Sequence, residues 1–352
     1  MKKFLCVILA MFMVFALAGC GSTEPEQEQE QEDNTPKVIT LYTPAAQDYL
    51  DVLLPAFEEE TGIHVEAIRG ASGEVYARIQ AEAENPQADV AWFPCNYILQ
   101  DTSYFDQYVS PNNGLYDEKF QNETGYTTRI NYTVPVVIYN TEMYTKEIKG
   151  YADLLDEELF GKIAFGNASS SSSAYDQLEC MLYDMGTGST FEERVMSDSA
   201  WEYVEKFLKQ LDGSIVDSSS VTYNGVIDGE FVVGMSWDTP AAEFLYNKST
   251  NIGVCYMQEG VIVSDSCVSL IHNAPNAEAA KLFIDWISSE KGQSLMGTGT
   301  IGCNPLLPTA QVGDWKVGIT EFDAVTRTAD QKATMKEQIL AKFNDLYLQI
   351  FE

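Results

Sequence analysis

Length, composition and charge set the first limits on this protein. Its 352 residues are enough for two lobes with buried cores, and a 45% share of hydrophobic residues is ordinary for a globular chain. The formal net charge of −32 at pH 7 repels the phosphate backbones of nucleic acids, so the composition excludes nucleic-acid binding.

The first 36 residues predict export and a membrane tether. Lys2 and Lys3 precede a short apolar run, a pattern typical of a secretory signal peptide, here residues 1–19. The sequence "LAGC" ending at Cys20 resembles the bacterial lipobox, which implies cleavage before Cys20 and attachment of lipid to its thiol. The alternative is a plain signal peptide with a chance cysteine. Residues 20–36 carry six acidic side chains and no apolar periodicity, so we expect a lipidated, disordered tether.

The folded part is expected to begin near Lys37 with alternating strands and helices. Apolar, β-rich segments and helical spacing predict a strand at 37–44, a helix at 45–62 that stops at Gly62, a strand at 63–70, a helix from Ser72 to before Pro86, and a strand at 88–94. This order produces right-handed parallel crossovers. In such sheets ligands bind beyond the carboxyl ends of the strands.

A second block continues the α/β pattern. The predicted elements are a strand within 133–144, a strand at 162–165, a helix at 174–185, a helix, turn, strand and helix start over 221–245, two strands over 251–271, one amphipathic helix at 276–297 and a closing helix at 334–351. No internal repeat is strong enough to define a solenoid.

Motifs in a fixed order carry a resemblance to a known family. "YTP", "AFEEETGI", "GASGE" and "ADV" in the first block are followed by "IYN" at 138–140, "DGE" at 228–230 and "AAKLFIDWISSEKGQ". This set resembles the bacterial extracellular solute-binding proteins of ABC importers, in particular the ferric-iron, phosphonate and sugar-phosphate group. It covers roughly residues 37–310, and the lipobox fits independently because Gram-positive members are tethered lipoproteins.

The resemblance implies an α/β fold of the two-lobe, periplasmic-binding-protein-like kind, type II. Each lobe would be a mainly parallel sheet flanked by helices, and hinge crossover strands would let the lobes close on a ligand. Lobe 1 would comprise residues 37–135 plus about 262–310, and lobe 2 residues 136–261 plus about 311–352. The implied protein is a monomer without a cofactor, anchored through Cys20 to the cell membrane on its extracellular face or in the periplasm. Its partners would be a small-molecule solute and the permease and ATPase of an importer.

Five consecutive serines at 169–173 are the first candidate binding element. Taken alone, such a run is typical of a flexible linker or a bulk serine loop. Similar proteins carry a stretch resembling "DPASSGSAY" where this chain has "NASSSSSAY" at 167–175. Serine hydroxyls and free N–H groups at a helix start form a site for an anionic oxygen. We therefore expect Ser171, Ser172 and Ser173 to bind the ligand.

The sequence "GASGE" predicts a second helix N-terminus, in the facing lobe. Ser72 is expected to cap the helix that Gly73 helps to open, and it could serve only as that cap. Two helix N-termini facing one another across a cleft would favour phosphate, phosphonate or carboxylate and offset the negative charge of the chain locally. Thr43, Phe93 and Cys95 follow strand ends, so topology directs them to the same cleft.

The chain departs from the ferric-binding relatives at their metal ligands. Those relatives carry two adjacent tyrosines shortly after the "GE" turn, and the corresponding places here fall near Thr239 and Pro240. Tyr223 and Asn224 are nearby polar candidates, but they cannot replace a tyrosine pair as hard oxygen ligands. Direct ferric binding therefore stays only as an alternative.

Trp237 and Asp238 occupy the segment that would link the lobes. Trp supplies an apolar or cation–π face, and Asp accepts hydrogen bonds or pairs with an ammonium group. The alternative is a core Trp with an Asp that caps a helix before Pro240. Together with an anion site they suit a small zwitterion, such as an aminophosphonate, or a sugar phosphate. A polyamine, which would use Asp238 and the acidic surface, is the rival ligand.

Two other classes of protein find less support. The chain contains no G-x-S-x-G, H-E-x-x-H or P-loop motif and only two histidines, so we expect no enzymatic activity. A surface adhesin would show exposed repeats, which the sequence lacks. After Cys6 and Cys20, five cysteines remain without a C-x-x-C pair; Cys255 and Cys267 could form a disulfide or stay as buried free thiols.

Overall fold

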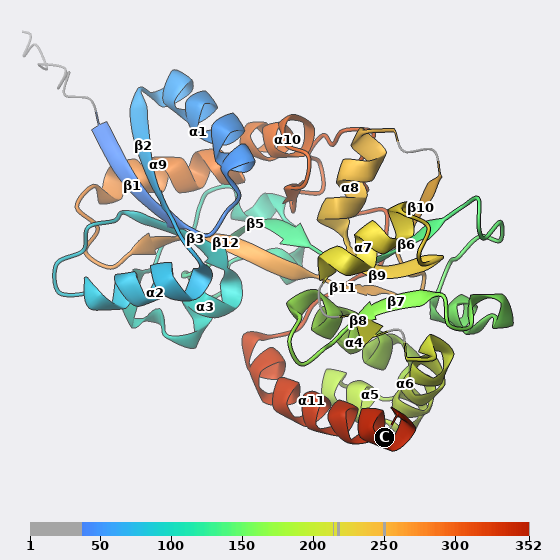
Figure 1. The fold of residues 1–352 in the computed structure, drawn as a ribbon. Helices are drawn as coiled ribbons and strands as arrows, with labels where there is room; N and C mark the ends of the chain where they lie inside the picture. The colour runs from blue at the N-terminus through green and yellow to red at the C-terminus, as the bar shows by residue number, and fades with distance from the viewer. Residues whose placement is uncertain (1–36, 214, 217–218, 249–250, 352) are drawn as a thin grey trace, which may run out of the picture. The chain divides into compact units, whose positions relative to one another are not determined.

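The computed structural model describes residues 37–213, 215–216, 219–248 and 251–351 (Figure 1). The predicted signal peptide, lipidation site and tether lie outside the described residues. No helix in the described ranges is long and apolar enough to cross a lipid bilayer.

The first sheet contains the strands of the first block together with later segments. Its order is β13-β5-β12-β3-β1-β2, with β4 paired to β12. The strands are β1 (Lys37–Thr43), β2 (Ile63–Arg69), β3 (Val90–Pro94), β4 (Phe105–Asp106), β5 (Thr128–Thr133), β12 (Ser264–Ile271) and β13 (Asn304–Pro305). β1, β2 and β3 are parallel, as predicted, but β12 runs antiparallel to β3 and β5 because it returns from the second sheet. The first sheet is therefore mixed rather than mainly parallel.

The second sheet is also mixed. Its order is β10-β6-β9-β7-β8, with β6 antiparallel to β9 and β10 and with β7 parallel to β9 and β8. The strands are β6 (Pro135–Asn140), β7 (Ile163–Gly166), β8 (Ile215–Val216), β9 (Val233–Trp237) and β10 (Ile252–Cys255). A short parallel pair of β11 (Val261–Ile262) and β14 (Ala324–Val325) lies beside the return to the first sheet.

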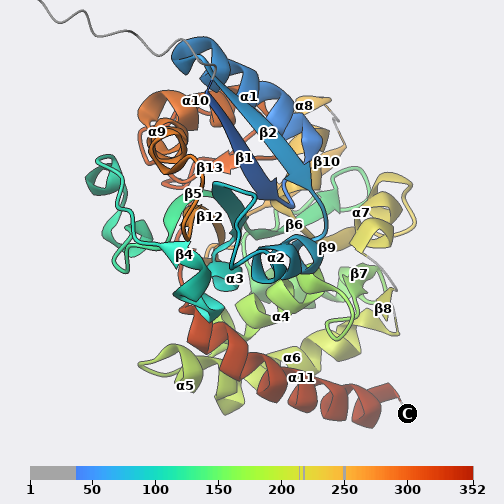
Figure 2. The same cartoon turned by 90° about the vertical axis from the view of Figure 1, so that its left-hand side faces the viewer.

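Helices cover both sheets (Figures 1 and 2). With the first sheet go α1 (Gln47–Thr61), α2 (Ser72–Ala81), α3 (Cys95–Gln100), α9 (Ala277–Ser288) and α10 (Glu290–Gly299). With the second go α4 (Ser172–Met185), α5 (Phe191–Met196), α6 (Asp198–Leu211), α7 (Ser219–Ile227), α8 (Asp238–Tyr246) and α11 (Ala329–Phe351). Figure 2 shows α11 running along α5 and α6.

Local signals fixed most boundaries, and two predictions need correction. Gly62 ends α1 in the left-handed conformation, at φ 69°, and its N–H donates to Glu58 O, as the predicted stop requires. The predicted single helix at 276–297 is two helices, because Ser289 adopts an extended backbone and caps α10 through the N–H of Gly292. Only glycine fits at 292, where a Cβ would lie 2.3 Å from Trp286 O. The segment 251–271 forms three strands rather than two.

The five cysteines of the described residues are free and buried. Cys255 lies in β10 of the second sheet and Cys267 in β12 of the first, so they are not neighbours in one sheet. The free-thiol alternative is therefore confirmed.

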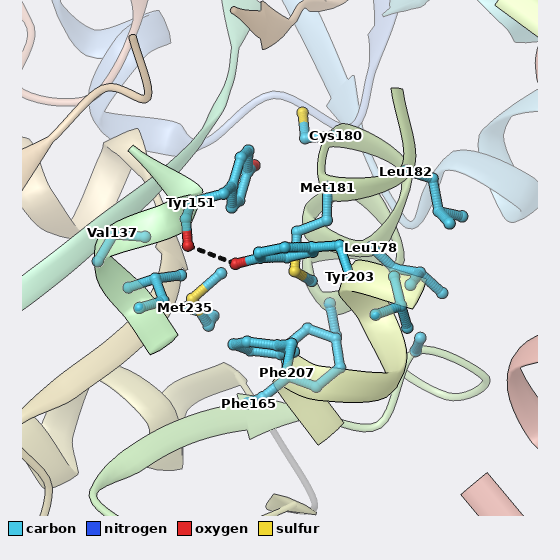
Figure 3. Close-up of a cluster of buried hydrophobic side chains, with 14 of the residues drawn as sticks. Val137, Tyr151, Phe165, Leu178, Cys180, Met181, Leu182, Tyr203, Phe207 and Met235 are labelled. Atoms are coloured by element: carbon cyan, nitrogen blue, oxygen red, sulfur yellow. Dashed lines mark hydrogen bonds between the residues drawn. The ribbon is translucent and has the colours of Figure 1, made fainter. Parts of the chain in front are cut away.

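The core beneath the second sheet holds α4 in place. Figure 3 shows Leu178, Met181 and Leu182 of α4 packed among Phe165, Tyr203 and other buried side chains. The hydroxyl of Tyr203 donates a hydrogen bond to Tyr151 O at 2.6 Å, which satisfies the polar end of an otherwise apolar ring (Figure 3).

Candidate solute-binding site

A pocket lies where the chain crosses from the first sheet to the second. Thr133 pairs with Ser264 in the first sheet, Pro135 pairs with Trp237 in the second, and Val134 alone joins them. These three crossover residues line a pocket of about 180 Å³ together with Ser173, Asp176 and Trp237. The pocket is large enough for a small solute. It lies between the start of α4 and the end of β9.

The serine run folds as a turn and a helix start rather than as a flexible linker. Directly after β7, Asn167 O accepts hydrogen bonds from the N–H groups of Ser170 and Ser171, at 3.1 and 2.9 Å. Ser171 is the N-cap of α4, where its Oγ accepts a hydrogen bond from the N–H of Ala174. The prediction that a helix begins within the run is confirmed.

The start of α4 has the chemistry of an anion site. N–H groups in the first turn of a helix have no partner within the helix, and the helix dipole favours negative charge there. The hydroxyls of Ser171 and Ser173 lie 3.2 Å apart, and Ser173 faces the pocket. Ser173 therefore brings a hydroxyl group of a helix start to the pocket, and such a start can bind an anionic oxygen.

Gln177 fixes the start of α4 against the crossover, and sequence reasoning missed it. Its side chain is buried, and its Nε2 donates to Val136 O at 2.8 Å and to Ser236 O at 2.7 Å. These carbonyls belong to β6 and β9, the two strands that continue from the pocket lining. A glutamine within the apolar face of a predicted helix was the signal that could have revealed this role.

Of the neighbouring residues Trp237 and Asp238, only Trp237 lines the pocket. Trp237 is half-buried, lines the pocket, and meets the ring of Tyr223 edge-on at 5.6 Å between centroids. Asp238 is 1% exposed and is not among the residues that line the pocket. Its N–H donates to Val134 O, and its Oδ2 accepts a hydrogen bond of 2.6 Å from Asn304 Nδ2. Asp238 therefore fastens α8 to the crossover and to β13, and Trp237 rather than Asp238 occupies the N-cap position.

Burial raises the pKa of Asp238 to about 8, against the hydrogen bonds that stabilise its charged form. Its Oδ1 has no hydrogen-bond partner among the described residues. The buried carboxyl group, bonded to Asn304, is therefore a structural anchor of α8.

The other predicted residues of the second lobe lie beside the pocket rather than in its wall. Tyr223 is half-buried behind Trp237, and Asn224 is exposed on α7. Thr239 donates from Oγ1 to Gly302 O at 3.5 Å, close to the hydroxyl of Tyr49.

The predicted residues of the first lobe do not meet the pocket. Thr43 is fully buried, with its Oγ1 accepting a hydrogen bond from the N–H of Ala45, while Phe93 and Cys95 pack in a hydrophobic cluster under α2. Ser72 is half-buried and Gly73 exposed. The prediction that Ser72 caps the helix was wrong. The N-cap residue, which has an extended backbone, is Ala71, and Ser72 is the first residue of α2.

A buried ion-pair cluster behind the pocket also escaped sequence reasoning. Arg327, whose side chain is 3% exposed, places Nε 2.8 Å from Glu179 Oε2 and Nη2 3.5 Å from Asp176 Oδ1. Its Nη1 donates to Val263 O in the return crossover. Arg327 thus ties the segment before α11 to α4 at the level of the pocket.

No group of three or more His, Cys, Asp or Glu side chains that could hold a metal ion occurs in the part of the chain that the structure describes. The two histidines lie at the surface, where His64 pairs with Glu58 and His272 with Asp106. They contribute nothing to the pocket.

Two mixed sheets joined by short crossovers, with a pocket at the crossover, define the class of two-lobe periplasmic binding proteins. The sequence model for the family described as bacterial extracellular solute-binding protein matches residues 39–297, and the chain belongs to that family. It is a solute-binding protein rather than an enzyme, as the sequence predicted.

Three similar proteins illustrate the range of solutes in the group. The iron uptake protein A1 of Synechocystis sp. is 24% identical over 83% of this chain and 82% of its own length. A Salmonella typhimurium protein, provisionally named for binding 2-aminoethylphosphonate, is 23% identical over 81% of each chain. The periplasmic binding protein AfuA of Actinobacillus pleuropneumoniae, solved with fructose 6-phosphate, superposes with a TM-score of 0.65 at 21% identity, covering 89% of this chain and 99% of AfuA.

Proposed function

We propose that this protein is a lipid-anchored extracellular binding protein that captures a small anionic or zwitterionic solute, such as a phosphonate or sugar phosphate, and delivers it to a membrane permease. The observation that carries the proposal is the pocket of about 180 Å³ in which Ser173, at a helix N-terminus, and Trp237, at a strand end, face the same space. Donors for an oxyanion and an aromatic wall are what such a solute requires.

Capture would proceed by closure of two lobes about the crossovers. The sorting of strands into two sheets supports the lobe division at about residue 135 and again at about 262. The short link at Val134 is suited to a hinge, because few residues would absorb the change in backbone angles.

The proposed class of solute rests on two features. One is the set of hydrogen-bond donors at the start of α4, and the other is the lack of a tyrosine pair at residues 239 and 240. AfuA was solved with a sugar phosphate, and one relative carries a name for aminophosphonate binding. The iron uptake relative keeps ferric iron as the alternative. Thr239 and Pro240 stand where ferric-binding relatives are expected to carry tyrosines, and neither supplies a hard anionic ligand.

Native mass spectrometry of the freshly purified full chain tests the solute class. We expect a co-purified phosphorus-containing acid that is released on denaturation. Iron, or a polyamine without an acidic group, bound in its place would contradict the proposed class, and a chain that binds none of these solutes in titrations would contradict the proposed function.

Removal of the serine hydroxyls should weaken binding. In the variant with Ser171, Ser172 and Ser173 all replaced by Ala, we expect at least a tenfold loss of affinity for a phosphonate, because charge-assisted hydrogen bonds contribute about 1.5–3 kcal/mol each and only the backbone donors survive. Isothermal titration calorimetry measures the effect. The matched control replaces Ser169 and Ser170, which precede the helix, and should stay within about twofold of the wild type. Equal affinities in all three proteins would contradict the anion site.

The lipid anchor has a separate test. Replacing Cys20 by Ala should release the protein from the membrane fraction without changing solute affinity, because the acyl chains would provide the attachment. Fractionation followed by calorimetry measures both properties. A variant that stays with the membrane would show that another segment anchors the chain.

A further inference from the structure

One charged side chain lines the pocket, and the anion site does not account for it. Besides Ser173 and Trp237, the lining contains Asp176, whose side chain is 24% exposed, and the apolar or hydroxyl groups of the crossover. A carboxylate this close to an anion site would repel a purely anionic solute. The position of Asp176 therefore indicates that the solute is not purely anionic.

We propose that Asp176 binds a cationic nitrogen of the solute, so that the protein selects a small zwitterion whose acidic and basic groups are only a few bonds apart. This inference rests on the proposed function of the pocket as the solute site. It names Asp176, not Asp238, as the residue that determines specificity for the basic group.

The geometry of α4 supports the assignment. Ser173 and Asp176 are three residues apart on one helix, and both line the pocket. Side chains at this spacing share one face, with Cβ atoms about 5–6 Å apart. An acid held at Ser173 and an ammonium held at Asp176 would therefore be separated by a short linker, such as two methylene groups.

The side chain of Asp176 lies between two cationic residues and the pocket. Arg327 Nη2 lies 3.5 Å from Oδ1, but the other guanidinium nitrogens of Arg327 face Glu179 and Val263 O. The charge of Lys332 also acts on Asp176, while 24% of the Asp176 side chain stays exposed where it lines the pocket. Arg327 thus holds the group in place, and an ammonium group of the solute would contact its exposed part.

Trp237 completes the site for a cation. Its half-buried ring lines the same pocket, and the electron-rich face of an indole attracts ammonium groups. Asp238 cannot take this role, because it is 1% exposed and hydrogen-bonded to Asn304 away from the pocket wall.

Calorimetry with two matched probes tests the proposal on the full chain. The probes are 2-aminoethylphosphonate and ethylphosphonate, which differ only by the amine. We expect the wild type to bind the amine-bearing probe at least tenfold more tightly. Asp176→Asn should abolish that preference while leaving the affinity for ethylphosphonate unchanged or slightly higher. The control Asp345→Asn, which removes the same charge from an exposed position of α11, should keep the preference of the wild type.

The outcomes separate the two proposals. Tight but equal binding of both probes by the wild type would leave the anion site standing and overturn the role of Asp176. Equal losses for both probes in Asp176→Asn would show that Asp176 only supports the fold, and would also overturn it. Failure of the wild type to bind either phosphonate would contradict the phosphonate class of the proposed function, and the zwitterion inference would fall with it.

Discussion

Replacing Arg327 by Met is expected to lower the free energy of unfolding by about 3–5 kcal/mol. The substitution leaves Glu179, which is fully buried, without the guanidinium that lies 2.8 Å from its carboxylate. Burial already raises the pKa of Glu179, and Arg327 opposes that shift. Without Arg327 the pKa of Glu179 should rise further, so Glu179 should take up a proton more readily. The loss of stability should therefore be smaller at pH 5 than at pH 8. Urea unfolding followed by tryptophan fluorescence measures it.

A double variant provides the control. In Arg327→Met with Glu179→Gln the buried charge is gone, and the hydroxyl of Tyr175 can still donate to Oε1, as it does to Glu179 at 3.1 Å. We expect the double variant to recover most of the lost stability. A single variant as stable as the wild type, or a double variant no better than the single, would show that the ion pair does not hold α4.

Elements specified by neighbouring residues could be predicted from the sequence. The run from β1 to β3 follows local periodicity, and its first helix ends at a glycine whose φ of 69° other residues rarely adopt. The serine run was predicted as the start of α4 because polar caps and an apolar helical repeat stand next to each other. In these cases the signal and the structure lie within one element.

Side-chain direction at the strand ends could not be predicted in the same way. Topology correctly placed Thr43 and Phe93 at the ends of parallel strands, but it does not state which way each side chain turns. Thr43 turns back to the N–H of Ala45, and Phe93 turns into the core under α2. The order and direction of the strands determine which residues lie at the edge of a sheet. The packing of their side chains determines which of those residues a ligand can reach.

The pocket itself depends on contacts between distant segments. Asp176 faces it only because the crossover at Thr133–Pro135 and the end of β9 meet the start of α4. Arg327 comes from a segment far along the chain, and no local pattern links it to α4. Sequence reasoning therefore named Ser173, which lines the pocket, but it named Asp238, which does not, and omitted Asp176, which does.

The stability of the protein should depend on pH through Asp184, which lies near the end of α4. Neither carboxyl oxygen of Asp184 has a hydrogen-bond partner among the described residues. Burial and the charge of Glu259 raise its pKa to about 8, with Asp323 adding to the shift and Arg194 opposing it. An unfolded Asp titrates at about 3.9. The folded state therefore keeps a proton that the unfolded state loses, and stability falls as the pH rises from about 4 to about 8.

Asp184→Asn should remove this dependence, because an amide of the same shape carries no charge at any pH. At pH 4 the variant and the wild type should unfold at similar urea concentrations. At pH 8.5 the variant should be more stable by several kcal/mol, with an upper bound on the order of 5 kcal/mol set by about 1.36 kcal/mol per pH unit over the window. Asp238, whose pKa burial also raises to about 8, should leave a residual slope in the variant. The exposed control Asp345→Asn should follow the wild type at every pH. Parallel curves for wild type and Asp184→Asn from pH 4 to 8.5 would show that solvent reaches Asp184 and that its carboxylate is not confined beneath Gly260 as the structure places it.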